Sequence, residues 1–215
     1  MTTVQPHTFT CPLCNNVFET NLVTSSNSFG PLHSDFYREA VGAQPVCNFA
    51  HTCTNCGFSG FDGDFASPQA FTEEFRQKVA DTITPEVRAR KIETNGHYYL
   101  VALCAEWQGA TPLALGRIYQ MGAWCHRTRN EPDKERFFLA RAAEFFERGI
   151  RAGEAKGENM ALYTYILGDL YRRLGNPDMA KEWYRKAIET VKISGGDLKV
   201  AEIAELQLAD PKDIL

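Results

Sequence analysis

Two Cys-x-x-Cys loops, at residues 11–14 and 53–56, place the strongest constraint on how this chain can fold. Two residues between a pair of thiolates let the backbone wrap one side of a metal ion, so two such loops complete a tetrahedron of sulfur ligands. The residue after each loop often needs a positive φ, and Asn15 and Gly57 are the types that tolerate it best. The predicted metal ligands are Cys11, Cys14, Cys53 and Cys56.

The predicted ion is a structural Zn²⁺, one per chain. Four thiolates fill every position of a tetrahedral site, whereas a catalytic zinc keeps one position open for water or substrate. Thiolates also bind iron, which stays the alternative, but nothing else in the sequence suggests electron transfer, so zinc is preferred. We therefore expect the metal to stabilise the fold rather than to perform a reaction.

The other cysteines and a nearby histidine leave alternatives open. Cys47 and His51 lie close to the second loop, where either could replace a ligand, build a second site or simply pack. Cys104 and Cys125 fall on apolar faces of predicted helices and are expected to be small core residues. Because the first residues carry no export signal, the seven cysteines favour metal binding and free thiols over disulfides.

A thiol redox protein is the less favoured interpretation of the Cys-x-x-Cys loops. Redox dithiols begin a helix that follows a strand, where the helix N-terminus lowers the thiol pKa. The residues after the two loops, Asn15-Asn16 and Gly57-Phe58, are poor helix starts. The spacing alone therefore favours the metal.

Charge and composition change near residue 66, which predicts two domains. Residues 1–66 hold one basic residue against five acidic ones, whereas residues 67–215 hold 22 of each sign. The first part is rich in Cys, Phe, Asn, Ser and Gly, and the second in Ala, Leu, Glu, Arg and Lys. We predict a mainly α fold: a small β and loop zinc-ribbon-like module over 1–66, followed by an α-helical TPR-like repeat domain over 67–215.

Helix signals punctuate the second part of the chain. Pro recurs at the first position of predicted helices after a Ser, Thr or Asn cap, and glycines stand where those helices would end. Between these signals, apolar residues recur at helical spacing. The predicted helices cover residues 68–82, 85–93, 97–107, 112–128, 132–153, 159–174, 177–193 and 198–209.

Residues 161–194 have the length and pattern of one tetratricopeptide (TPR)-like helical hairpin. Gly168 and Ala180 are small where the two helices would approach closely, and Tyr184 would fill the space beside them. Residues 112–153 carry a longer, irregular version of the pattern. An ordinary helical bundle is the alternative, but repeats that share a core predict a stack with flanking helices as caps.

The order of these segments resembles an uncharacterised bacterial family in which a four-Cys zinc module precedes TPR-like helices. The resemblance covers most of residues 9–192. It implies a cytoplasmic, metal-stabilised protein with a helical-repeat surface, and it transfers no catalytic residue. Besides the two cysteine loops, it is carried by residues 34–37 (Ser-Asp-Phe-Tyr), 100–105, Ala123-Trp124 and 170–175.

A TPR-like stack predicts an adaptor, because its concave groove, lined by the first helix of each pair, suits a protein or peptide partner. Arginines beside an aromatic side chain would suit an acidic or C-terminal peptide. A solvated helix face is the alternative for each residue, and a homo-oligomer is left open. The predicted partner-binding residues are Arg117, Gln120, Leu162, Tyr165, Asp169 and Arg172.

Other classes of function fit the sequence less well. A net charge of −4, with one arginine in the first 66 residues, disfavours phosphate contacts, so a zinc-ribbon nucleic-acid-associated protein is kept only as the alternative. The sequence contains no phosphate loop and no Ser–His–acid arrangement, so we expect no enzyme. It also contains no run of about 18 apolar residues, so we expect no membrane insertion.

Overall fold

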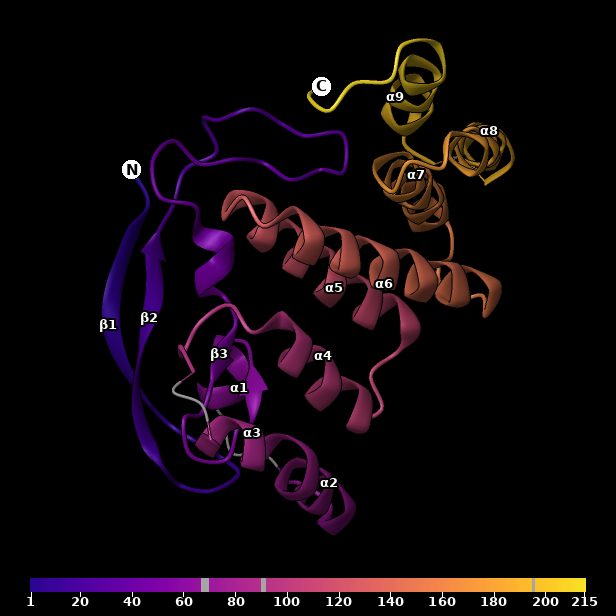
Figure 1. The fold of residues 1–215 in the computed structure, drawn as a ribbon. Helices are drawn as coiled ribbons and strands as arrows, with labels where there is room; N and C mark the ends of the chain where they lie inside the picture. The colour runs from indigo at the N-terminus through magenta and orange to yellow at the C-terminus, as the bar shows by residue number, and fades with distance from the viewer. Residues whose placement is uncertain (67–69, 90–91, 195) are drawn as a thin grey trace.

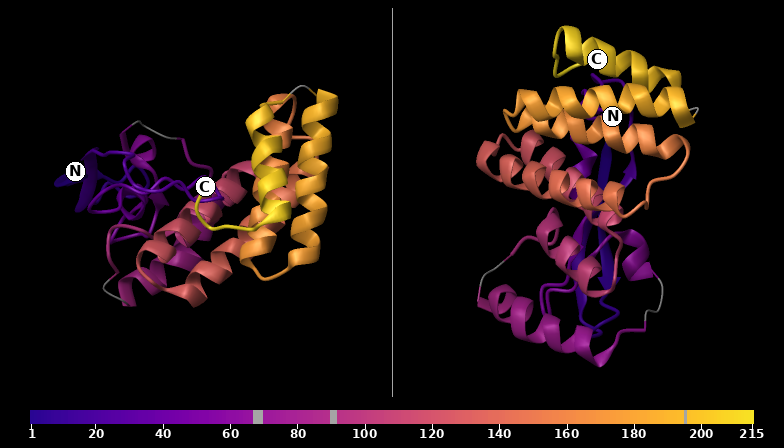
Figure 2. Two further views of the ribbon diagram at one scale, coloured as in Figure 1. Left: turned by 90° about the horizontal axis from the view of Figure 1, so that it is seen from above. Right: turned by 90° about the vertical axis from the view of Figure 1, so that its right-hand side faces the viewer.

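The computed structural model describes residues 1–66, 70–89, 92–194 and 196–215 of the chain. Its fold is mainly α-helical, with two small antiparallel sheets in the N-terminal part, as predicted (Figure 1). The helices stack in chain order, from α2 and α3 at one end to α9 at the other (Figure 2). In the part of the chain that the structure describes, no helix combines the length and apolar character needed to span a bilayer.

The N-terminal part is built from two hairpins of different length. Strands β1 (Thr3–Thr10) and β2 (Val17–Ser25) pair from Thr3 opposite Ser25 to Thr10 opposite Val17, so the first Cys-x-x-Cys loop forms their turn. Strands β3 (His51–Thr52) and β4 (Ser59–Gly60) enclose the second loop in the same way. A 3-10 turn, η1 (Pro45–Asn48), and a short helix, α1 (Asp62–Ala66), flank the second hairpin.

Most predicted helices are confirmed to within two residues at each end. They are α4 (Tyr98–Trp107), α5 (Pro112–Thr128), α6 (Pro132–Arg151), α7 (Glu158–Arg173), α8 (Pro177–Ser194) and α9 (Leu198–Ala209). The capping chemistry is as expected at α5, where the Thr111 hydroxyl accepts a hydrogen bond from the Ala114 amide.

The region of the first two predicted helices differs from the expectation. Helix α2 (Glu73–Lys78), the π-helical turn η2 (Val79–Ile83) and α3 (Thr84–Ala89) follow one another without a break. The helix start predicted at Thr84-Pro85 lies instead inside this continuous stretch. The other predicted start, Ser67-Pro68, lies outside the described residues.

Glycines set the close contact within both helical hairpins, α5–α6 and α7–α8. A Cβ at Gly116 of α5 would lie 2.8 Å from Cδ1 of Phe146 of α6. A Cβ at Gly168 of α7 would likewise lie 2.8 Å from Cδ1 of Tyr184 of α8. The prediction that a small residue at position 168 permits close approach is therefore confirmed.

The hydrophobic packing crosses the predicted domain boundary at residue 66. One cluster joins Phe58 and Phe65 of the N-terminal part to Phe75 and Ile83 of the α2–α3 stretch. The other joins residues of the 37–50 segment, such as Val46, to helices α4–α9. The boundary itself stays a prediction, but the parts on either side of it share their cores.

The expectation of free thiols at Cys47 and Cys125 was wrong. The two residues form a disulfide between η1 and α5, 78 residues apart in sequence, with their Cα atoms 4.9 Å apart. Cys125 is buried as expected, but it reaches a partner that sequence spacing could not identify. Cys104 is a buried free thiol, as predicted, and burial raises its pKa to about 12.

We predict that the double variant Cys47→Ala/Cys125→Ala unfolds more easily than the disulfide-bonded chain. Closing a loop across 78 residues of sequence lowers the entropy of the unfolded chain, which is worth about 4 kcal/mol in the loop-entropy account. Equilibrium unfolding in denaturant, with metal present and reductant absent, measures the difference. Cys104→Ala is the control, and a double variant that unfolds no earlier than this control would contradict the crosslink.

Candidate metal centre

Both Cys-x-x-Cys loops adopt the same backbone turn. The amide of Cys11 donates to the carbonyl of Asn16, and that of Asn15 donates to Cys11, both at 2.9 Å. The second loop repeats the pattern, because Cys53 donates to Phe58 and Gly57 donates to Cys53 at the same distance. The residue after each loop has positive φ, 59° at Asn15 and 82° at Gly57, which confirms the reason given for these residue types.

The two turns bring four sulfur atoms together. The Sγ atoms of Cys11 and Cys56 lie 3.6 Å apart, those of Cys14 and Cys53 lie 3.7 Å apart, and all four lie within 4.8 Å of one another. A tetrahedral zinc with Zn–S bonds of about 2.3 Å would place its sulfurs about 3.8 Å apart. The group therefore has the size of a four-thiolate metal site.

Burial and hydrogen bonding also suit a bound cation. Cys11, Cys53 and Cys56 are buried and Cys14 is half-buried. The hydrogen bond to Cys53, together with burial, raises the pKa of Cys11 to about 12 when no metal is present. Four thiolates at these distances need a positive charge among them, and a divalent metal ion supplies it.

Asparagine side chains surround the sulfurs as donors. Asn16 Nδ2 lies 3.8 Å from Cys53 Sγ and Asn55 Nδ2 lies 3.5 Å from Cys14 Sγ, so each loop donates to a thiolate of the other. Donors of this kind spread the negative charge of the thiolates and fix their orientation. The two loops are thus linked directly as well as through the ion that they could hold.

The α2–α3 stretch holds the loops from outside. Arg76 donates to the Leu13 carbonyl at 3.1 Å, the Thr84 hydroxyl donates to the Cys56 carbonyl at 2.7 Å, and Arg88 Nε donates to the Asn55 carbonyl at 3.2 Å. A Cβ at Gly57 would lie 2.4 Å from Cγ2 of Ile83, so helix and loop touch at a position where only glycine fits.

Comparison with known proteins places this chain in a family. The model of a family described as an uncharacterized protein conserved in bacteria (DUF2225) matches residues 5–207. The chain belongs to this family. No curated protein and no solved structure matches it.

His51 and Cys47, which the sequence left open as additional metal ligands, do not join the four cysteines. Among the described residues, the group consists of the four cysteines of the two loops. His51 is buried and held on both ring nitrogens, since Nε2 lies 2.7 Å from Asp62 and Nδ1 lies 2.9 Å from Thr20. Burial lowers the pKa of His51 against the opposing effect of Asp62. Cys47 is held in its disulfide with Cys125.

Four of the six predicted partner-binding residues of this DUF2225 chain contact one of its own segments. Residues 30–39 form a tight hairpin, closed by an antiparallel bridge between Leu32 and Arg38, which runs from the N-terminal part across α5 (Figure 1). We call it the 30–39 hairpin. Its tip contacts four of the predicted residues: Gln120 donates to the Asp35 carbonyl, Tyr165 to the Ser34 carbonyl, and Ser34 Oγ bonds to Asp169 and Arg172.

The remaining two predicted residues lie away from these contacts. Arg117 is exposed on α5, and Leu162 of α7 is half-buried against the core. Gln120, Tyr165 and Asp169 are buried, so the face that sequence register assigns to a groove is filled by the chain itself at those positions.

Asp35 forms a buried ion pair that was not predicted from the sequence. Its carboxylate is fully buried and receives Arg127 Nη1 at 3.2 Å, Arg127 Nη2 at 2.7 Å and Trp124 Nε1 at 3.0 Å. Although burial alone would raise its pKa, Arg127 and Arg173 hold the pKa below the ordinary 3.8. The ionised Asp35 carboxylate therefore stabilises the fold fully at pH values well above 3.8, and this stabilisation is lost as the pH falls through the lowered pKa. The signal in the sequence was the excess of acidic over basic residues in 1–66, because a buried acidic residue there must find its basic partner in the rest of the chain.

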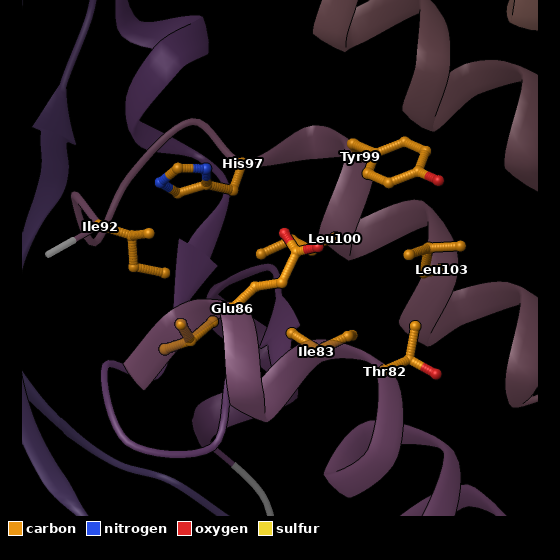
Figure 3. A pocket seen from close by; sticks show the side chains of 9 residues that line it. Thr82, Ile83, Glu86, Ile92, His97, Tyr99, Leu100 and Leu103 are labelled. Atoms are coloured by element: carbon orange, nitrogen blue, oxygen red, sulfur yellow. The ribbon is translucent and has the colours of Figure 1, made fainter. Parts of the chain in front are cut away.

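A separate cavity of about 330 Å³ lies between the η2–α3 turn and α4 (Figure 3). Aliphatic side chains such as Ile83, Leu100 and Leu103 form most of its lining, with Glu86 and His97 among the polar groups. Burial lowers the pKa of His97, so its imidazole is neutral at pH 7. None of the four cysteines lines this cavity.

We predict that Cys53→Ser removes the metal and loosens more than the two loops. Losing one of four ligands leaves an incomplete site, so the metal content should fall from one ion per chain towards none. Because α2–α3 packs on the loops, hydrogen exchange should speed up in residues 73–89 as well as in the hairpins, and stay slow in α5–α8. Elemental analysis and exchange mass spectrometry measure both effects. Cys104→Ala should keep its metal, and stoichiometric metal in Cys53→Ser would overturn the assignment.

We predict that Asp35→Asn lowers the free energy of unfolding by about 3 kcal/mol, because it removes the fully buried charge of a pair whose half-buried partner, Arg127, then keeps only Glu135. Asp213→Asn is the matched control: its carboxylate also pairs with an arginine but is 67% exposed, so its loss should cost less than about 1 kcal/mol. Denaturant unfolding of both variants with metal present makes the comparison. Equal losses would show that the Asp35 pair contributes no more than a surface ion pair.

Proposed function

We propose that this DUF2225 protein is a non-catalytic, zinc-stabilised adaptor that binds a protein or peptide partner through a TPR-like helical surface. The observation that carries the proposal is the group of four cysteines, which fills all positions of a tetrahedral ion and leaves none for a substrate. The zinc is structural in this proposal and present once per chain.

The contacts around the four cysteines support a bracing role for the metal. The ion would join the turn of the β1–β2 hairpin to the loop between β3 and β4, and α2–α3 donates to the carbonyls of both loops. Two-stranded hairpins of this size are marginal alone, so a shared metal would stabilise both at once. The helical stack then receives a rigid N-terminal part.

The helical stack supports the adaptor role. The hairpins α5–α6 and α7–α8, followed by α9, have the order and close Gly contacts that TPR-like repeats use. Helices α5 and α7 carry the face that already holds another segment of the chain, the turn of the 30–39 hairpin. A face with polar groups that bind one backbone segment suits a partner peptide beside it. We also propose that the protein acts in the cytoplasm.

The adaptor role predicts a discrete crosslink from the exposed face of α5. A photo-crosslinking amino acid in place of Arg117, incorporated in bacterial cells, should give one major protein adduct, and the purified partner should bind the unlabelled chain in solution. Lys181, exposed on the outer helix α8, is the matched control position and should give no such adduct.

The same crosslink separates the competing functions. An adduct that nuclease removes would favour the zinc-ribbon nucleic-acid alternative, and an adduct with a second copy of the chain would favour a homo-oligomer. No adduct at either position, together with four loop thiols that oxidise and reduce reversibly, would favour the redox alternative and contradict the adaptor.

A further inference from the structure

The C-terminal segment, residues 210–215, is bound to the 30–39 hairpin as an added strand. His33 forms an antiparallel bridge with Ile214, the Ser34 amide donates to the Asp213 carbonyl at 2.9 Å, and the Leu215 amide donates to the Leu32 carbonyl at 2.9 Å. In Figure 1 the end of the chain reaches back from α9 to this hairpin. The arrangement is that of a peptide that adds a strand to an exposed edge.

A charge contact fixes the position of this segment. Oδ1 of Asp213 lies 2.9 Å from Nη2 of Arg172 and 3.4 Å from Nη1 of Arg173. The two arginines also hold Asp169 of their own helix, at 2.8 Å each, so they are positioned before any segment binds. The site thus offers backbone partners for an extended chain and a preset pair of guanidinium groups for one carboxylate.

The segment is exposed along its length, although the buried Gln207 side chain of α9 bonds both the carbonyl and the amide of Lys212 at 3.0 Å. All of residues 210–215 are exposed, with Asp213 at 67% and Ile214 at 50%. By contrast, Ser34 and Asp35 of the hairpin tip are fully buried. The exposed ion pairs and edge hydrogen bonds to the hairpin contribute little individually. The link to α9, fixed by Gln207 at Lys212, keeps residues 213–215 beside the hairpin mainly by their high local concentration. A competing peptide can therefore replace these residues without disturbing the tip.

We propose that the edge of the 30–39 hairpin at residues 32–34, together with Arg172 and Arg173, is a binding site for an extended acidic peptide of a partner protein. The chain's own segment 210–215 occupies this site as an internal ligand. The partner peptide pairs with Leu32 and Ser34 as a β-strand and places a carboxylate where Asp213 lies. This inference rests on the proposed adaptor function and names its site.

The test uses a fluorescent peptide with the sequence of residues 209–215 (Ala-Asp-Pro-Lys-Asp-Ile-Leu) and the full chain carrying Asp213→Lys. The substitution places a positive charge against Arg172 and Arg173, so the internal segment leaves the site. Fluorescence anisotropy should show the peptide binding to this variant at least tenfold more tightly than to the unchanged chain. A peptide with Lys in place of its second Asp should bind at least tenfold more weakly.

A second variant that ends at residue 209, the last residue of α9, removes the internal segment altogether and should bind the peptide as Asp213→Lys does. Metal content and thermal melting confirm that each variant is folded. Folded variants that bind neither peptide, or both equally, would overturn the site. Peptide-induced dimers would assign the site to a second copy instead. Peptide binding without any crosslink at Arg117 would support the peptide site and contradict the adaptor role. A crosslink at Arg117 without peptide binding would support the adaptor role and contradict the peptide site.

Discussion

Four thiols within 4.8 Å of one another are the constraint on which the N-terminal part depends. Ionised, they repel one another, and protonated, they make only weak hydrogen bonds among the buried residues that include Phe58 and Phe65. A divalent metal neutralises the thiolates and ties together two loops that have 38 residues between them in sequence. The aromatic residues around the loops, such as Phe58 and Phe65, then pack on a fixed framework, and α2–α3 can close over it.

A second, electrostatic constraint fixes the N-terminal part on the helices. The acidic character of residues 1–66 is answered at one point by Arg127 and Arg173, which reach the buried Asp35 from α5 and α7. A carboxylate without water needs such partners, so the 30–39 hairpin has one position in which its charge is satisfied. The disulfide from Cys47 to Cys125 holds the following segment to the same helix. The two ends of the N-terminal part are thus held by different chemistry, thiolates at one and an ion pair at the other.

Local patterns made the group of four cysteines, the turns after its loops and most helices predictable. The Cys-x-x-Cys spacing, Asn15 and Gly57 act within a few residues, and so do the Pro and Gly signals at Pro112 and Gly175. The contacts that the sequence did not reveal join distant positions: Cys47 with Cys125, and Asp35 with Arg127. Gln120, Tyr165 and Asp169, which helical register placed on one face, all contact residues 34 and 35, but register carries no information about which segment covers that face.

The contacts on this face differ in burial, and this difference separates a segment that belongs to the fold from one that a partner peptide can replace. Ser34 and Asp35 are fully buried, and removing them would expose desolvated charges on α5 and α7, so the hairpin tip belongs to the fold. Residues 213–215 pair with the outer edge of the same hairpin and remain largely in solvent. Their release leaves Arg172 and Arg173 paired with Asp169, so no buried charge loses its partner. A helical face can therefore be permanently filled by one segment of its own chain and still present, at the edge of that segment, a place where a second strand comes and goes.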